Sequence, residues 1–310
     1  MIGKASEMVV REQAADGTME RPAVSRRSMQ QAGCASAPCE GSEASGTSGS
    51  AKAKGRSVRE QAPPPQDHTK SSQPRDTASW AVSTNVLHVS QVSAEAVNLN
   101  VEGHRVAGAL QGFGQLWQKT YKVRLTGTKV NPKEVVRVWK EEFPSFHPPQ
   151  SRFYPPLDGV APGEVMLINA SVQGMPVYTG VMVLYADEES FTVMTAEGLP
   201  EAGWNTFSAY EDRDGTTVAQ VQSLARASDP IYELGFRLFG STEQEKIWIH
   251  VLTSLAARFE VNERVHLEKV CVDTNLQWSR IGNVWHNAGV RSMIYTMAAP
   301  LRWGRTRLGR

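Results

Sequence analysis

Residues 247–259 read IWIHVLTSLAARF and carry the strongest helical pattern in the chain. Apolar residues recur every three or four positions from Ile247 to Phe259, so they form one continuous stripe along a helix. Ser241 and Gln244 have the spacing of a capping box, which places the start of this helix at residue 241. We predict a long amphipathic helix over residues 241–259, whose apolar stripe must be covered by a second layer.

Strand-like runs of sequence precede this helix. They are residues 165–172, 177–186, 191–196, 204–211 and 216–227. The connections between them are short, and residues 212–215 read DRDG, which is a hairpin signal. Neighbouring strands this close in sequence pair antiparallel, because a parallel crossover needs about a dozen residues or more. We therefore predict a curved antiparallel sheet that covers the long helix.

One further strand and one further helix come first. Residues 117–125 alternate between apolar and polar side chains, which is typical of a half-buried strand. Asn131 and Pro132 suit the N-cap and the first position of a helix that presents one apolar face as far as Phe143. The predicted fold class is α+β: a curved antiparallel sheet gripping a long C-terminal helix, with a disordered N-terminal segment and a helical C-terminal tail.

The order of elements over residues 116–259 resembles that of the helix-grip (SRPBCC) superfamily, which includes START lipid-transfer domains, Bet v 1-like proteins and polyketide cyclases. The resemblance rests on topology and on the placement of the long helix, and no diagnostic motif accompanies it. Members usually have a second short helix and six strands before the last helix, so we expect an edge strand within residues 152–157. The resemblance implies a cavity for a hydrophobic ligand and no single reaction.

Composition divides the chain into four parts. Residues 1–79 contain no aromatic residue and are rich in Ser, Ala, Gly, Gln and Pro, so we predict that they are disordered. Residues 80–115 are a transitional segment in which no period holds. Residues 116–260 form the helix-grip-like domain. Residues 261–310 form a tail with eight basic and three acidic residues.

Overall composition argues against several classes of protein. The formal net charge of the 310 residues is +1, so a nucleic-acid partner is not expected. No window reaches about 18 consecutive apolar residues, as a transmembrane helix would. The N-terminus lacks the apolar region of a secretory signal, and three cysteines cannot form a disulfide framework. We therefore expect a cytoplasmic protein.

Aromatic and polar residues of the strands and the long helix are the candidates to line a cavity. They are Tyr121, Asn169, Tyr185, Met194, Trp204, Phe207, Tyr210, Arg226, Trp248 and His250. Isolated polar groups on the strands, such as Thr179, would orient a ligand if they faced inward. Both faces of residues 204–211 mix apolar and polar side chains, so alternation leaves open whether Trp204 or Phe207 faces the helix.

The tail carries a second apolar stripe. Its candidate docking or membrane residues are Trp278, Trp285, Arg302, Trp303 and Arg305. Tryptophan beside arginine next to an apolar helix is typical of a segment that lies on a membrane surface. The same stripe could instead dock on the acidic body formed by residues 80–260, and we favour docking.

No motif for a nucleophile, a metal or a bound phosphate stands out. Cys34 and Cys39 lack a second pair of ligands at zinc spacing, and none of the seven histidines belongs to an HxxxH pair. The glycines at positions 112 and 114 lack the third glycine of a dinucleotide fingerprint. We therefore predict no cofactor, no metal site and no assigned catalytic residue.

Three functions are compatible with these patterns. The preferred one is a binding or carrier protein for a small hydrophobic or amphipathic ligand held between the sheet and the long helix. The second is an enzyme of the polyketide-cyclase kind, with Tyr210, Arg226 and His250 as the first candidates for proton transfer. The third is a protein that binds a membrane surface through its basic tail. A non-enzymatic role is favoured, because the sequence carries no catalytic motif.

Overall fold

The structure is a computed structural model that describes residues 76–300, except residues 85, 91–92, 158, 173 and 240–241. The chain divides into two compact units, Met1–His68 and Thr69–Arg310, and the described residues lie in the second. The predicted disorder falls on residues 1–79, of which only the last four are described. That prediction is untested, and Arg302, Trp303 and Arg305 also lie outside the described residues.

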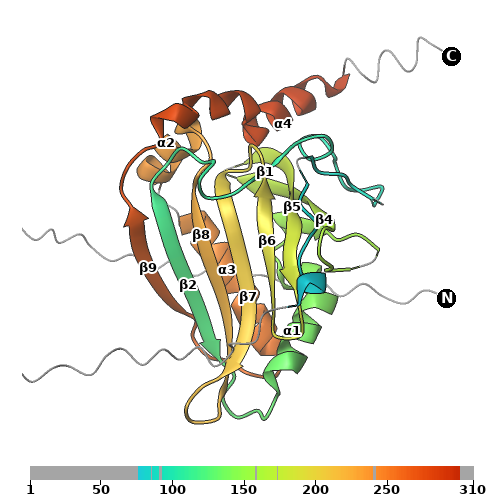
Figure 1. Cartoon of the computed structure of the whole chain (residues 1–310), viewed down its shortest axis with the longest axis vertical. Coiled ribbons are helices and arrows are strands. Elements are labelled where there is room, and N and C mark those ends of the chain that lie inside the picture. Colours follow the sequence, from blue (N-terminus) through green and yellow to red (C-terminus); the bar gives the residue numbers. More distant parts are fainter. Residues whose placement is uncertain are drawn as a thin grey trace, which may run out of the picture. The chain divides into compact units, whose positions relative to one another are not determined.

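One antiparallel sheet contains the strands of the described residues (Figure 1). They are β1 (Val106–Ala107), β2 (Leu116–Arg124), β3 (Ser151–Tyr154), β4 (Val165–Val172), β5 (Met175–Ala186), β6 (Ser190–Ala196), β7 (Glu201–Glu211), β8 (Thr217–Ala227) and β9 (His266–Asp273). Their order across the sheet is β3-β4-β5-β6-β7-β8-β2-β9, and β1 pairs with β6 outside this path. Strands β3 to β7 each pair with the next strand in sequence, as the short connections predict.

The described residues also form helices, which precede, interrupt and follow the run of strands along the chain. They are α1 (Pro132–Glu141), α2 (Pro230–Phe239), α3 (Thr242–Arg258) and α4 (Ala288–Met297), with 3-10 helices η1 (Thr77–Ser79), η2 (Phe143–Phe146) and η3 (Trp278–His286). The Asn131 side chain caps α1 by accepting a hydrogen bond from the Lys133 amide at 2.9 Å, as its sequence position predicts. Among the described residues, no helix has the length and apolar character that a membrane span requires.

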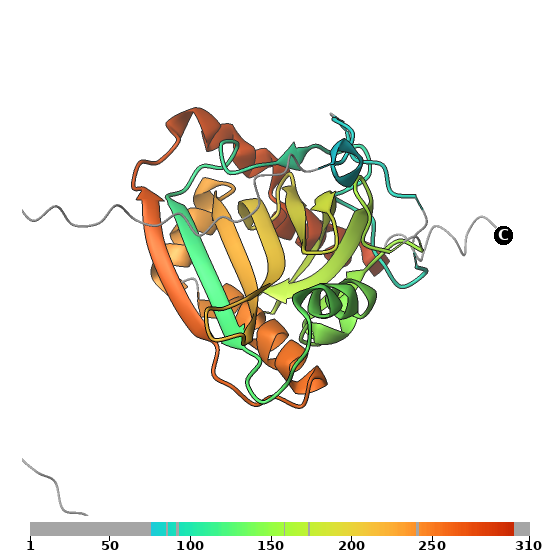
Figure 2. The same cartoon turned by 60° about the horizontal axis from the view of Figure 1, so that its bottom comes forward.

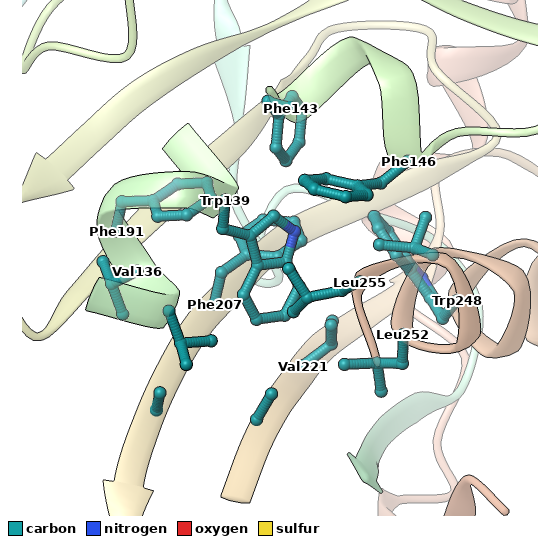
Figure 3. Packing of buried hydrophobic residues seen from close by; sticks show 14 of the residues in the cluster. Val136, Trp139, Phe143, Phe146, Phe191, Phe207, Val221, Trp248, Leu252 and Leu255 are labelled. Atoms are coloured by element: carbon teal, nitrogen blue, oxygen red, sulfur yellow. The ribbon is translucent and has the colours of Figure 1, made fainter. Parts of the chain in front are cut away.

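The main hydrophobic core lies between the inner face of the sheet and the helices α1 and α3. Figure 2 shows these two helices on one side of the curved sheet. In Figure 3 the indole of Trp139 from α1 lies beside Phe143, Phe207 of β7 and Leu255 of α3. These four side chains are fully buried. The apolar stripe of the long helix is therefore covered by the sheet, and the predicted α+β class is confirmed.

The outer face of the sheet is also covered in part. Leu87 and Val101, from the segment in which no sequence period holds, pack with Val165, Leu167 and Met182 in a second apolar cluster. Helix α4 packs against β5. Strands β4 to β6 are therefore buried on both faces, so large apolar side chains occur on both sides of them.

The structure refines two details of the predicted topology. The expected edge strand within residues 152–157 is present as β3, at Ser151–Tyr154. Strand β9 (His266–Asp273) is not predicted; it lies in the segment assigned to the tail and pairs with β2. Its pattern escapes sequence analysis because apolar and polar residues do not alternate regularly along it, and much of the strand, including Val270 and Val272, is exposed, as at a sheet edge.

Candidate functional site

A cavity of about 170 Å³ lies between the inner face of the sheet and helix α3. The apolar part of its lining includes Val177, Val181, Val193, Phe207, Ile247 and Trp248. These residues come from β5, β6, β7 and α3, so the cavity forms where the long helix crosses the sheet. Its position and apolar lining are those of a site for a small apolar group.

Three buried polar atoms interrupt the apolar lining of this cavity. They are Oγ1 of Thr179, Oδ1 of Asn205 and Nε1 of Trp248, and each lacks a hydrogen-bond partner in the described part of the chain. A buried polar group without a partner destabilises a fold by about 1–3 kcal/mol. Such groups persist at sites where a ligand supplies the missing partner.

Removing one of these groups tests this interpretation. We expect Thr179→Val to raise the free energy of unfolding of the unliganded protein by about 1–2 kcal/mol, because valine keeps the branched shape and lacks the unpaired hydroxyl. Urea unfolding followed by circular dichroism measures the change. Thr195 is the matched control, since it lines the same cavity but its hydroxyl donates to the Ala107 carbonyl at 2.7 Å. Thr195→Val should destabilise; equal destabilisation by both variants would contradict an unpaired Thr179.

A polar cluster borders the cavity at the first turn of α3, where Glu201 and Gln244 belong to its lining. The Lys119 ammonium donates to Oε1 of Gln244 at 2.7 Å, and Nε2 of Gln244 donates to the Glu201 carboxylate. The Lys119 nitrogen also lies 3.9 Å from carboxylate oxygens of Glu201 and Glu245. Lys269 pairs with Glu245 at 3.0 Å on the outer side. Gln244 thus bridges a cation and an anion that come from β2 and β7.

Burial sets the electrostatics of this polar cluster. The Lys119 side chain is 7% exposed and that of Glu201 is 14% exposed. Burial raises the pKa of the Glu201 carboxyl, and the positive charge of Lys119 partly opposes this shift. The cluster therefore holds a weakly acidic carboxyl beside a buried ammonium, so it can both donate and accept hydrogen bonds at the end of the cavity.

A second cavity of about 270 Å³ adjoins the first one. It is lined by Trp117, Lys119 and Arg237 among others, and it shares Glu201 and Phe236 with the first cavity. Glu201 therefore stands between an inner, apolar space and an outer, more polar one.

Three predicted lining residues lie on the inner side of the molecule. Phe207 and Trp248 line the inner cavity. Tyr121 belongs to the same core and is fully buried, but it lies outside the lining of the cavity. Burial raises the pKa of the Tyr121 phenol, whose oxygen has no hydrogen-bond partner among the described residues.

Asn169 and Tyr185 lie on the outer face, contrary to the predicted lining role. Oδ1 of Asn169 accepts from the Val97 amide at 3.2 Å. The Tyr185 ring lies 4.8 Å from that of Trp80, measured between centroids. A register irregularity in β5 before Tyr185 turns this side chain away from the core. It contacts Trp80 instead, in the described part of residues 80–110, which we call the N-terminal cover because it lies over the outer face of the sheet.

Met194, Trp204 and Tyr210 also lie on the outer face. Met194 and Trp204 are opposite each other on β6 and β7, and both approach Gly108 of the N-terminal cover. Tyr210 is 38% exposed. Since Phe207 faces α3, strand alternation sends Trp204 and Tyr210 to the other side. Sequence alternation does not decide which face of β7 points inward. In the structure it is the face that carries Phe207.

The proposed proton-transfer residues do not converge in one pocket. His250 is exposed on α3, and Tyr210 lies on the outer face of β7. Arg226 borders the outer cavity, but its buried guanidinium donates to the Gly114 carbonyl at 3.2 Å and to Asp273 at 3.1 Å. The cyclase hypothesis in this form loses its geometric basis, because proton transfer needs the groups within hydrogen-bond reach of one substrate.

The described part of the tail packs on the sheet. Oγ of the buried Ser292, in α4, accepts from the Tyr178 amide of β5 at 2.9 Å. The Trp278 ring packs edge-to-face against Phe113 at 5.4 Å. Trp285 is 82% exposed. This packing agrees with docking, and membrane binding by the tail stays an untested alternative.

Several residues of the site are absent from the sequence-based candidates. Lys119, Glu201 and Gln244 escape notice because each is a common surface residue type, and their meeting depends on pairing between distant segments. Thr179 is recognised as an isolated strand polar group, and Asn205 shares its strand face with Phe207. If the inward face of the sheet were known from the sequence, both residues would be candidates to line the cavity.

No family model matches the chain, and no curated protein matches it either. Solved structures similar to about half of this chain include a conserved protein from Geobacillus kaustophilus, with 11% identity and a TM-score of 0.37, covering 48% of this chain and 99% of that one. A START superfamily protein from Mycobacterium smegmatis has 19% identity and a TM-score of 0.33, covering 47% and 98%. The di-domain ARO/CYC StfQ from the steffimycin biosynthetic pathway has 11% identity and a TM-score of 0.37, covering 47% and 51%.

The class of protein follows from the architecture itself. A curved antiparallel sheet that grips a long C-terminal helix defines the helix-grip arrangement, and this chain resembles that superfamily in fold. Fold alone assigns neither ligand nor reaction.

Proposed function

We propose that this protein binds a small amphipathic molecule in the inner cavity, as a carrier or binding protein. The observation that carries this proposal is the apolar cavity between the sheet and α3, with three buried polar atoms that lack partners among the described residues. An apolar cavity fits a hydrophobic group, and the unpaired atoms fit a small number of hydrogen bonds that fix its orientation.

The volume of the inner cavity limits the size of the apolar group. An apolar cavity of about 150 Å³ accommodates benzene. The inner cavity, at about 170 Å³, therefore suits one aromatic ring or a short branched chain. A larger ligand would extend past Glu201 into the outer cavity, where Lys119 and Glu201 border the path.

The unpaired atoms favour a ligand with a hydroxyl group. Oδ1 of Asn205 accepts a hydrogen bond, Nε1 of Trp248 donates one, and the Thr179 hydroxyl can do either. A hydroxyl on the ligand can serve any of these partners, because it both donates and accepts. A purely apolar ligand of the same size would leave all three atoms unpaired.

A matched pair of probes tests the proposal. We expect p-cresol to bind with a Kd at least tenfold lower than that of toluene, since the two differ only in the hydroxyl. Isothermal titration calorimetry measures Kd, and ligand-dependent thermal shifts give an independent readout. Similar affinity for both probes would contradict the role of the polar atoms, and binding of neither would contradict the cavity as a binding site.

Filling the cavity provides the second arm of the experiment. Ala170 lines the cavity on β4, so Ala170→Phe should weaken p-cresol binding at least tenfold by occupying the space. Gln222 on β8 is the control, because it faces the other side of the sheet, opposite Thr206 and Thr120 in the register. Gln222→Phe should leave the Kd unchanged. Equal loss in both folded variants would place binding elsewhere.

A further inference from the structure

A second cluster of chemically reactive groups lies away from the cavity. His104, Glu197 and His286 each offer a ligand atom, and these atoms all lie within 4.8 Å of one another. Nδ1 of His286 is 3.5 Å from Oε2 of Glu197, and Nδ1 of His104 is 3.9 Å from the same oxygen. The three residues come from the N-terminal cover, the turn after β6 and the end of η3.

Backbone hydrogen bonds beside each residue hold the three segments together. The Glu197 amide donates to the Arg105 carbonyl at 2.8 Å, next to His104. The Ala288 amide donates to the Gly198 carbonyl at 2.8 Å, two residues after His286. Gly198 has a φ of +85°, and a Cβ built there would lie 1.8 Å from the His286 carbonyl oxygen. The close approach of these segments therefore requires glycine, and it positions the three side chains independently of any ion.

Two imidazoles and one carboxylate form a known type of metal-ligand set. Zn²⁺ in catalytic sites is held by such a set with an open fourth position. Bonds of about 2.0–2.2 Å in tetrahedral geometry put ligand atoms roughly 3.3–3.5 Å apart. The separations of Glu197 from His286 and His104, 3.5 and 3.9 Å, are close to this geometry, and all three ligand atoms lie within 4.8 Å of one another, so side-chain rotation can bring them around one ion. The three side chains are partly exposed, so an ion from solution can reach them.

The charges around the cluster are compatible with ligation. Burial, followed by the nearby positive charge of Arg291, lowers the pKa of the His104 imidazole. The Arg291 charge opposes a cation, and the Glu197 carboxylate offsets it. The Glu197 carboxylate thus brings one negative charge to the site, and the nearby Arg291 side chain brings one positive charge.

We propose that His104, Glu197 and His286 form a site for a divalent transition-metal ion, with Zn²⁺ as the fitting probe, and that the ion fastens the C-terminal tail to the sheet. His286 is followed directly by Asn287, whose side chain caps α4. An ion held by His286, Glu197 and His104 would therefore join α4 to the turn after β6 and to the N-terminal cover.

Zinc titration of the full chain, stripped of metal beforehand, tests the site. The wild-type protein should bind one Zn²⁺ in competition with a chromophoric chelator and gain thermal stability. His104→Gln, Glu197→Gln and His286→Gln should each weaken binding at least tenfold, and they lie on three separate segments, so one unstable variant does not decide the result. His250→Gln, on the exposed side of α3, should bind as the wild type does.

Two outcomes would overturn the proposal. Zinc that stays bound at equal affinity in all three folded ligand variants would belong to other residues, such as Cys34 and Cys39. Limited proteolysis tests the fastening role: cleavage within residues 278–300 should slow several-fold when Zn²⁺ is added to the wild type, and should not slow in His286→Gln. Equal cleavage with and without zinc in the wild type would remove that role.

Discussion

Trp139→Ala is expected to lower the free energy of unfolding by about 3–5 kcal/mol, which is the upper part of the range for single substitutions. The Trp139 indole is fully buried at the centre of the main core. It packs edge-to-face on Phe207 at 5.3 Å and on Phe191 at 6.2 Å. Truncation therefore removes a large apolar surface and leaves a cavity that the strands of the sheet cannot close.

Urea unfolding compares this variant with a matched one on the same helix. Arg137 is exposed on α1, where it forms ion pairs with Glu134 and Glu141 at 2.5 and 2.6 Å. Exposed pairs on a helix stabilise a fold only weakly, so Arg137→Ala should change stability far less than Trp139→Ala. If both variants lose a similar free energy of unfolding, the effect would come from weakening helix α1, and the packing of the Trp139 side chain would contribute little.

Trp139 also shows why the architecture could be predicted from sequence. The Asn131 cap, the Pro132 start and one apolar face are sufficient to predict α1, and the stripe from Ile247 to Phe259 is sufficient to predict α3. Both signals are local, because they depend on spacing within one helix. The short connections between strands are equally local, so they determine the antiparallel pairing of β4 to β8.

The inward face of the sheet could not be predicted, for a physical reason. Alternation identifies the core face of a strand only when the other face meets water. Here residues such as Leu87 and Val101 cover the outer face, so Met194 and Trp204 are large and apolar although they point away from α3. A sheet covered on both sides gives an ambiguous pattern, so the candidate lining residues include side chains of both faces.

The two clusters of charged or ligating residues were beyond sequence analysis in a different way. Lys119 and Gln244 meet across 125 positions of sequence. His104 and His286 approach one another only because strand and turn contacts join their segments. Spacing rules recognise metal or catalytic sites built on one helix or one turn, and they cannot detect sites assembled from three distant segments.

Lys119→Met is expected to destabilise the protein by about 3 kcal/mol at neutral pH, because it leaves the buried Glu201 carboxylate without its cation. Both side chains are largely buried, so water compensates little for the lost charge. Methionine keeps the length and packing of the lysine stem, which confines the change to the charge and its hydrogen bond to Gln244. The double variant Lys119→Met/Glu201→Gln should recover most of the loss, since it removes both charges.

The pH dependence of these variants identifies the group responsible. Burial raises the pKa of Glu201 in the folded state, so the folded state holds that proton more tightly than the unfolded state does. Stability linked to Glu201 is therefore present below its ordinary pKa and is lost as the pH rises through the raised value. The difference in free energy of unfolding between the wild type and Lys119→Met should become smaller as the pH falls from about 8 to about 5. The free energy of unfolding of the double variant should depend less on pH. A deficit that is independent of pH would assign the loss to altered packing around the substituted side chain, and would rule out the unpaired carboxylate as its cause.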